Sequence, residues 1–350
     1  MHISTEPGVT QTIPKKIEYR PSTLRRLWEA AGAFLQEAGP WIRLSLGAFL
    51  LPFVNWLGIP SPCAAALLLA VPTRGTQALY PLAGLAASFL FRLIGGTTLD
   101  IWQYAGCMGL WAVLLFYRPK TLPSLVAMAG LSMLPRAVSV MVTGNVLSSL
   151  LACAAVPLCM GLTLAFQRGA VLLRDSRPIL SFQEKAFAIL LALAIISGLG
   201  YLRVWTVNLG QAAALLSTLV CAYALGGASG AAGGLLCGAG LALCGHDSRL
   251  ALHMALAGLA AGLVPSGKKR WLSALSALGG HMVAFSLTSF ADPALPHLTA
   301  LVGCLLFLLV SERPIERLRT SGLAAVPTGR GMEGLFVQQR LLRWESAMRA

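Results

Sequence analysis

Charged side chains are scarce in this sequence. Only 11% of the 350 residues are Asp, Glu, Lys or Arg, whereas a typical soluble domain has about 25%. A larger core cannot make up for this shortage, because the surface of a soluble protein still has to be covered with polar groups. Acidic residues are the rarest, with 13 Asp and Glu against 27 Lys and Arg. The composition therefore argues against a water-soluble globular protein.

The motifs of common catalytic sites are missing. The sequence contains no GxSxG, no HExxH and no Walker-type phosphate loop, and no two carboxylates lie at a spacing suited to acid–base chemistry. Most of the acidic residues lie in predicted tails and loops, so a metal-dependent hydrolase would find no ligands. We therefore expect no catalytic, cofactor-binding or metal site, and an enzyme embedded in the membrane is the weakest of the function classes.

The eight cysteines show no metal or disulfide pattern. None forms a CxxC pair, no cluster of His or Asp accompanies them, and all lie inside or beside apolar stretches. They are typical of small buried hydrophobic residues.

Long apolar runs fill most of the chain, and 56% of the residues are hydrophobic. Runs of about 18 to 20 residues are typical of membrane-spanning helices, and the short alternating strands of a transmembrane barrel are not seen. The predicted fold is all-α: a polytopic integral membrane helical bundle of ten to twelve spans. The count is a range because the first pair of segments is weak: prolines interrupt it, 61–72 is too short to span unless the membrane thins there, and 42–72 could be a re-entrant hairpin. The predicted segments are 42–58, 61–72, 77–94, 98–116, 122–142, 146–166, 183–201, 204–223, 225–245, 249–264, 271–289 and 296–311.

Positive charge is clustered in four places: the amino-terminal tail, the loop 168–185, Lys268-Lys269-Arg270, and the tail from Arg313 onward. An even number of predicted segments separates each cluster from the next, so all four fall on one side. The positive-inside rule places that side in the cytoplasm, and both termini with it. The net charge of +14 then reflects topology and contact with anionic lipid, and nucleic acid is not expected as a partner.

Three regions follow from this pattern. Residues 1–40 form a basic cytoplasmic tail, in which 22–36 is either a juxtamembrane helix or a solvated tail. Residues 41–312 form the polytopic membrane domain. Residues 313–350 begin a cytoplasmic linker helix, since 335–350 has a heptad-like apolar spacing that reaches Ala350 without a stop signal. We expect either a fragment of a longer protein or a naturally shortened one, although a frayed amphipathic end on the membrane surface fits equally well.

A few polar residues lie within the predicted spans, where they are functional candidates. We expect Arg136, directly after Pro135, to mark a break in its helix and to have a partner such as Asp100. Either these groups converge on a transport pathway, or they form scattered hydrogen bonds between helices. The candidates are Asp100, Arg136, Asn145, His253 and His281.

Glycines recur at every fourth residue in 225–245. Inside a bilayer such a stripe makes a flat groove on one helix face, where a neighbouring backbone can approach closely. The stripe either packs helices of one chain together or serves subunit association or a moving interface. Its members are Gly226, Gly230, Gly234 and Gly238, and Gly258 with Gly262 repeats the pattern in the next span.

The order of these parts resembles the membrane region of stage II sporulation protein E. The resemblance is clearest over 180–285, where a polar Leu-Ser-x-x-Glu start in "LSFQEKAFAILLALAIISGLG" precedes the Gly/Ala span "LGGASGAAGGLLCGAGLAL". A Gly-x-x-x-Gly span and a Gly-Lys pair follow in "MALAGLAAGLVPSGKKRWLSALSALGG". The resemblance is weaker over 45–170, and no single motif is diagnostic.

The resemblance implies about ten membrane helices ahead of a cytoplasmic linker and a manganese-dependent serine phosphatase domain. In the family the phosphatase acts on an anti-sigma-factor antagonist, and the protein gathers at the asymmetric division septum, where it binds the tubulin-like division protein. This chain stops where the linker begins, so no catalytic residue carries over, and manganese is expected only with the absent domain. The resemblance predicts a membrane anchor and interaction module at the cell membrane or septum, with the lipid bilayer, a second copy of the chain, and cell-division and sporulation proteins as partners. The alternative is a small-molecule or ion transporter, or its membrane subunit.

Overall fold

The computed structural model describes residues 39, 41–56, 62–71, 75–95, 100–117, 119–143, 146–169, 182–264, 270–288 and 293–320. The chain divides into two units, Met1–Pro40 and Trp41–Ala350, and the fold described here is that of the second. The expected juxtamembrane helix 22–36, the linker helix 335–350 and Asn145 lie outside the described residues.

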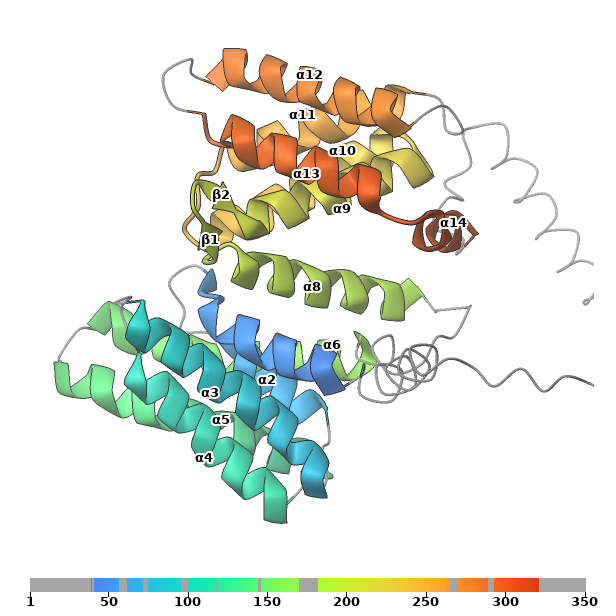
Figure 1. The fold of residues 1–350 in the computed structure, drawn as a ribbon. Coiled ribbons are helices and arrows are strands. Elements are labelled where there is room, and N and C mark those ends of the chain that lie inside the picture. Colours follow the sequence, from blue (N-terminus) through green and yellow to red (C-terminus); the bar gives the residue numbers. More distant parts are fainter. Residues whose placement is uncertain are drawn as a thin grey trace, which may run out of the picture. The chain divides into compact units, whose positions relative to one another are not determined.

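The described part of the chain is mostly helical, and each predicted apolar segment contains a helix (Figure 1). The first helix, Trp41–Phe53, ends in the 3-10 turn η1 (Leu51–Phe53). The others are α2 (Pro62–Ala70), η3 (Gly75–Ala78), α3 (Leu79–Ile94), α4 (Ile101–Phe116), α5 (Leu122–Thr143), α6 (Val146–Gly169), α8 (Phe182–Leu199), α9 (Leu209–Leu225), α10 (Gly227–Leu243), α11 (Leu250–Leu263), α12 (Arg270–Thr288), α13 (His297–Leu309) and α14 (Glu312–Thr320).

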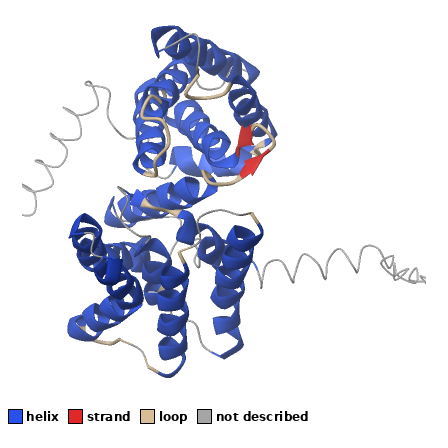
Figure 2. Cartoon of the chain, turned by 90° about the vertical axis from the view of Figure 1, so that its left-hand side faces the viewer, coloured by secondary structure: helices blue, strands red, loops and turns tan. Residues whose placement is uncertain are grey.

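A short hairpin replaces part of one predicted helix. We expected helix from residue 204, but β1 (Arg203–Val204) and β2 (Val207–Asn208) pair antiparallel, with Val204 opposite Val207 (Figure 2). Trp205 occupies the turn with a positive φ of 57° and is 97% exposed. The helix α9 then starts at Leu209, because the Asn208 side chain accepts a hydrogen bond from the backbone N–H of Gln211 and caps the helix.

The helices pack around two apolar cores, one in each half of the chain. The first core is built from Trp41–Phe53, α2 to α6 and part of α8, with Cys244 from the end of α10, and includes Leu110 and Phe166. The second is built from α9 to α14 and includes Met254 and Phe307. The helix α8 contributes to both, with Ala194 in the first core and Ile196 in the second, and therefore joins the two halves.

Among the described residues, two helices are long and apolar enough to cross a membrane, over Leu122–Val142 and Ser149–Gly169. Most other apolar helices have 10–17 residues, and α2 has nine, all buried. The predicted break near Arg136 is wrong, because α5 continues as one α-helix from Leu122 to Thr143 with Pro135 inside it.

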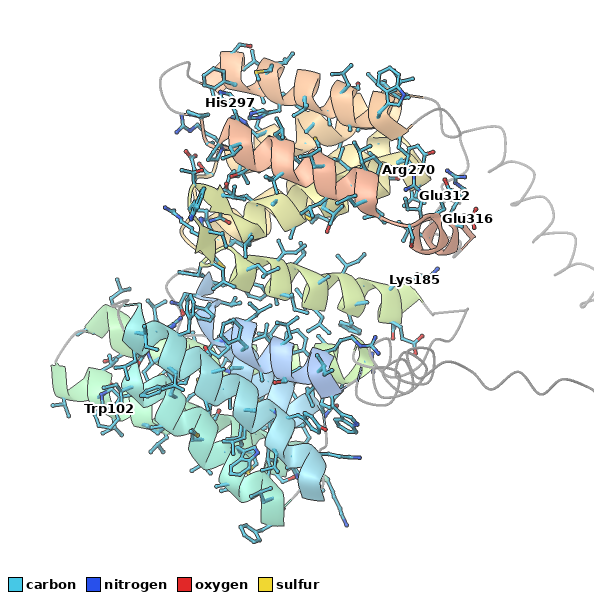
Figure 3. The ribbon with its side chains drawn as sticks, viewed as in Figure 1. Trp102, Lys185, Arg270, His297, Glu312 and Glu316 are labelled. Atoms are coloured by element: carbon cyan, nitrogen blue, oxygen red, sulfur yellow. The ribbon has the colours of Figure 1, made fainter. Side chains whose placement is uncertain are left out.

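The helix ends fall into two sets. Lys185 at the start of α8 and Arg270 at the start of α12 lie at one end of the helices, together with Glu312 and Glu316 of α14 (Figure 3). Arg168, at the end of α6, joins this set, because it donates a hydrogen bond to Gln183 of α8 over 3.1 Å. We call this the basic end. Trp102 and His297 lie at the opposite end, which we call the hairpin end (Figure 3); there Thr299 of α13 lies 3.4 Å from the backbone nitrogen of Asn208 in β2.

Candidate functional site

Glycines allow α10 and α11 to approach backbone to backbone. A Cβ added to Gly230 would lie 2.5 Å from the carbonyl oxygen of Gly258, and one added to Gly234 would lie 2.5 Å from the carbonyl carbon of Met254. A Cβ on Gly238 would lie 2.7 Å from the backbone nitrogen of Ala251. No side chain larger than hydrogen fits at these separations, so the three glycines form a packing surface within one chain.

The first glycine of the predicted stripe has another role. Gly226 is the single residue between α9 and α10 and ends the first helix while starting the second. Its φ of +93° and ψ of 177° lie in a region used almost only by glycine. A Cβ there would meet nothing within 4 Å, so Gly226 is required for the turn and not for packing.

The second glycine pair completes the contact from the α11 side. A Cβ on Gly258 would lie 2.5 Å from the carbonyl carbon of Gly230 and 2.6 Å from a methyl group of Thr218 in α9. A Cβ on Gly262 would lie 2.6 Å from the carbonyl carbon of Gly226. The stripe is therefore covered by α11 of the same chain, which leaves no glycine groove on α10 for a second copy.

Asp100 and Arg136 form an ion pair between α4 and α5 at the hairpin end. Asp100 also caps α4, since its carboxylate accepts a hydrogen bond from the backbone N–H of Gln103 over 3.3 Å. The Nε of Arg136 is buried and has no hydrogen-bond partner. Arg136 therefore pairs with Asp100, the partner that the sequence suggested.

A second arginine, which is buried and which the sequence analysis did not select, lies close to this pair. Arg92 of α3 donates a hydrogen bond to the carbonyl oxygen of Pro52 over 3.0 Å, and the Gln103 side chain donates to the same oxygen over 3.2 Å. Its guanidinium carbon lies 4.7 Å from the centre of the Phe53 ring. A cation at the last carbonyls of a helix is favoured by the helix dipole, so Arg92 completes the end of the helix Trp41–Phe53.

A polar cavity of about 430 Å³ opens beside these groups. Its lining comes from the end of the first helix, α3, α4, α5 and the turn after α8. The residues that line it are Phe53, Asn55, Phe91, Arg92, Asp100, Gln103, Arg136, Ser139, Val140 and Tyr201.

Three histidines form a chain of contacts across α11, α12 and α13. The Nδ1 atoms of His253 and His281 are 3.2 Å apart, and Nε2 of His281 lies 3.0 Å from Nδ1 of His297. Nε2 of His253 lies 3.1 Å from the hydroxyl oxygen of Thr288. His253 and His281 are buried, and the structure brings these two candidates together with a third histidine that the sequence analysis left out.

The proton of the Thr288 hydroxyl sets the direction of this chain. The hydroxyl oxygen lies 2.9 Å from the carbonyl oxygen of Ala284, and if the hydroxyl donates to that carbonyl, it accepts from Nε2–H of His253. The Nδ1 of a neutral His253 is then an acceptor, and His281 donates to it from Nδ1–H. By the same rule His297 donates from its own Nδ1–H to Nε2 of His281. All hydrogen bonds along the three histidines then point in the same direction, from His297 toward Thr288, and we call this histidine chain polarised. The Nε2 atom of His297 is then an acceptor.

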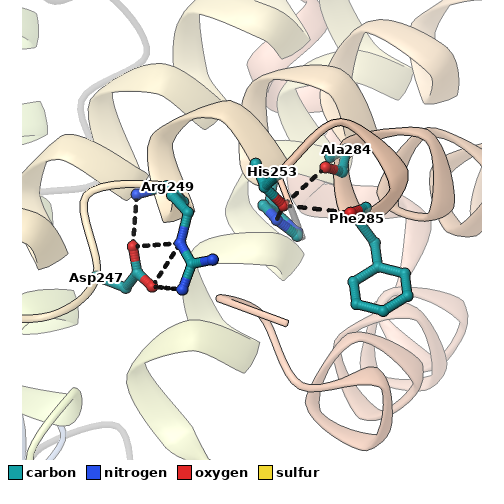
Figure 4. Close-up of polar contacts among 6 residues, drawn as sticks. Asp247, Arg249, His253, Ala284 and Phe285 are labelled. Carbon is teal, nitrogen blue, oxygen red and sulfur yellow. Dashed lines mark hydrogen bonds and ion pairs between the residues drawn. The ribbon is translucent and has the colours of Figure 1, made fainter. Parts of the chain in front are cut away.

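An ion pair precedes α11 in the loop after α10. Both carboxylate oxygens of Asp247 accept from the Arg249 side chain at 2.6–3.1 Å, and one also accepts from the Arg249 backbone N–H over 2.8 Å (Figure 4). These hydrogen bonds to Arg249 lower the pKa of Asp247 below its ordinary value of 3.8. Asp247 thereby orders the first turn of α11 and neutralises an arginine at the hairpin end.

The described residues contain no group of three or more His, Cys, Asp or Glu side chains placed to hold a metal ion. The histidine chain does not meet this requirement, because His281 turns a different ring nitrogen toward each neighbour.

No family model, no curated protein and no solved structure matches this chain.

Proposed function

We propose that the chain is a polytopic membrane domain that anchors and localises a cytoplasmic effector. Ten to twelve membrane segments would hold both chain ends on the cytoplasmic side. By its resemblance to stage II sporulation protein E, the effector would be a serine phosphatase that controls a sigma factor, and the place would be the cell membrane or the division septum.

The observation that carries this proposal is the distribution of small and large side chains on α10 and α11. Their inner faces hold glycine and alanine, such as Gly234 and Ala257, whereas Leu235 is 53% and Leu263 is 74% exposed. In water the larger apolar side chains would be the ones to bury, because the gain grows with buried apolar area. In lipid no such gain exists, and helices associate by close packing of small residues.

The short helices fit this setting when their neighbours are considered. The 14 residues of α11 span about 21 Å at 1.5 Å per residue, less than a hydrocarbon core of about 30 Å. However, α11 packs against α9, α10 and α12, so three neighbouring helices surround much of it. The helices α5 and α6, with 22 and 24 residues, are exposed along more of their length and are long enough to span.

Charge at the two helix ends supports a common cytoplasmic side. The basic end carries Arg168, Lys185 and Arg270. Arginines also occur at the hairpin end, among them Arg136, which pairs with Asp100, and Arg249, which pairs with Asp247. The positive-inside rule counts basic residues near the membrane and not net charge, so the proposed orientation rests on the basic clusters of the sequence, two of which include Lys185 and Arg270 at the basic end.

Association with a second copy remains part of the proposal, but it would use another surface. The glycine stripe is occupied by α11. The lipid bilayer and cell-division and sporulation proteins are the other proposed partners.

Reporter fusions test the topology. Alkaline phosphatase fused after Trp205 should be active, because the hairpin would face the outside, and fused after Lys268 it should be inactive. Green fluorescent protein should show the reverse pattern at these two sites and should fluoresce at both chain ends. Activity of both phosphatase fusions, or recovery of the chain as a soluble monomer without detergent, would refute the proposal.

A transporter is the second candidate, because the polar cavity and the histidine chain both lie toward the hairpin end. Changes at Arg136 or His281 that keep the protein folded should then abolish uptake of a substrate. For an anchor, the same variants should retain localisation, whereas enlarging Gly230 or Gly234 should disturb it. Comparing the two sets of variants in one strain separates the candidates.

A further inference from the structure

The polar cavity at the hairpin end has a surplus of positive charge. Arg92 and Arg136 both line it, and Asp100 is the single acidic residue among the lining residues that the structure describes. Its volume of about 430 Å³ lies within the range of about 300–1,000 Å³ that is usual for small-molecule sites. A group with one negative charge would balance the lining.

The two arginines are held in different ways. Arg92 is buried, and its guanidinium donates to the carbonyl oxygen of Pro52 beside the ring of Phe53. Arg136 pairs with Asp100, while its Nε has no hydrogen-bond partner. Because a guanidinium carries five N–H donors, one carboxylate leaves Arg136 with donors to offer to a further acceptor.

Neutral donors and apolar walls surround these charges. The amides of Asn55 and Gln103 and the hydroxyl of Ser139 line the cavity, and each can donate to an oxygen. Phe91 and Val140 line it as well, and Phe91 is 45% exposed. The lining thus combines hydrogen-bond donors with apolar side chains, which we call the apolar rim.

We propose that this cavity binds the phosphate group of a negatively charged molecule. Arg136 is the principal ligand and pairs with the phosphate in place of, or alongside, Asp100, while Gln103 and Ser139 donate to the remaining oxygens. Guanidinium groups suit phosphate because two parallel N–H groups can contact two oxygens. The apolar rim accommodates a glycerol or acyl portion.

Two molecules carry this chemistry: an anionic phospholipid, through its headgroup, and a soluble phosphate ester. The lipid source rests on the membrane location proposed above, whereas the soluble source does not. The binding experiment below and the topology experiment above have separate readouts, so failure of one is distinguishable from failure of the other.

The test measures binding to the purified full chain in neutral detergent. Phosphatidylglycerol, phosphatidylcholine and glycerol 3-phosphate are titrated and followed by native mass spectrometry and by thermal unfolding. The variants are Arg136→Gln, Arg136→Lys and Asp100→Asn. The matched control is Arg249→Gln, which breaks another arginine–aspartate pair outside the cavity lining.

The two partners of one ion pair should act in opposite directions. Arg136→Gln should weaken binding about tenfold, as expected for loss of one charge-assisted hydrogen-bonded contact. The affinity of Arg136→Lys should lie between that of Arg136→Gln and that of the unchanged chain, because lysine keeps the positive charge but lacks the two parallel N–H groups of the guanidinium. Asp100→Asn should bind as tightly or more tightly, because it removes a competing carboxylate, and Arg249→Gln should not differ from the unchanged chain.

The results distinguish a lipid from a soluble ligand and include two that would overturn the proposal. Preference for phosphatidylglycerol over phosphatidylcholine without an effect of glycerol 3-phosphate assigns the site to lipid, and stabilisation by glycerol 3-phosphate assigns it to a soluble ester. Equal weakening by Arg136→Gln and Asp100→Asn would show that the pair only supports the fold, and would overturn the proposal. So would equal binding of both lipids with no effect of the phosphate ester.

Discussion

Gly230 of α10 and Gly258 of α11 lie back to back. A Cβ on the first would be 2.5 Å from the carbonyl oxygen of the second, and a Cβ on the second would be 2.5 Å from the carbonyl carbon of the first. These separations are far below van der Waals contact, so neither position tolerates a side chain without moving a helix. At this pair, contact between the two backbones sets the distance between α10 and α11 in the second core.

Adding a single methyl group to this contact should therefore destabilise the protein. We expect Gly234→Ala to cost about 1–3 kcal/mol through overpacking, and Gly230→Leu or Gly234→Leu at least as much. Gly233→Ala is the matched control on the same helix, because its Cβ would meet only the Cys221 side chain, at 3.5 Å. Thermal unfolding in detergent measures the difference; equal midpoints for Gly233→Ala and Gly234→Ala would contradict the packing role.

Gly226 should be sensitive for a different reason. Its backbone conformation, and not crowding, excludes other residues, so Gly226→Ala should cost about 1–3 kcal/mol although a Cβ there meets nothing. Gly226→Asn should not rescue it, because φ +93° with ψ 177° lies outside the left-handed helical region that Asn adopts. The measurement is again the unfolding midpoint, and a midpoint equal to that of the unchanged chain would refute the backbone argument.

The polarised histidine chain predicts specific tautomers. Nitrogen-15 NMR of the labelled protein should find the proton of His253 on Nε2 and the protons of His281 and His297 on Nδ1. His281→Leu should destabilise the fold by about 1–3 kcal/mol, because ring nitrogens on both of its neighbours lose their partner. His246→Leu is the control, since Nε2 of His246 has no partner to lose. An Nδ1-protonated His253 would reverse the proposed direction.

Because of the Asp247–Arg249 pair, we expect the stability of the fold to depend slightly on pH in the acidic range. Because the folded state lowers the pKa of Asp247, its ionised form stabilises the fold above pH 3.8, and this contribution is lost as the pH falls through the lower, folded-state pKa. The unfolding midpoint of the unchanged chain should exceed that of Asp247→Asn at about pH 6, and the two should converge as the pH falls below 3.8. Arg249→Gln should show the same convergence. A difference that stays constant over this range would exclude the pair as its source.

Most helix positions were predictable because each apolar run contains a helix; α14 (Glu312–Thr320) was not, because its sequence is charged and lies beyond the last apolar run. The partners of buried polar groups were only partly predictable. Asp100 and Arg136 could be matched because charged residues are so few, but Arg92 lies near the end of a predicted segment, where a sequence offers no reason to bury it. Its burial depends on the carbonyl of Pro52, which is 40 residues away.

Two local features escaped the pattern for physical reasons. The spacing of four made Gly226 look like the first member of a stripe, although the adjacent Gly226-Gly227 pair is a turn signal. The hairpin was hidden because Val204 and Val207 extend an apolar run into strands of two residues each. In both places the chain makes a short turn, although the spacing of glycines or of apolar residues suggested a continuing helix.

The buried helix α2 has a consequence for how the chain is made. At nine residues it is about 14 Å long, too short to partition into a bilayer independently. It packs against α4, α5 and α6, and the last of these ends at Gly169. Residues 62–70 therefore leave the ribosome long before their surroundings exist, and the amino-terminal half can take its final form only after about a hundred further residues have been synthesised.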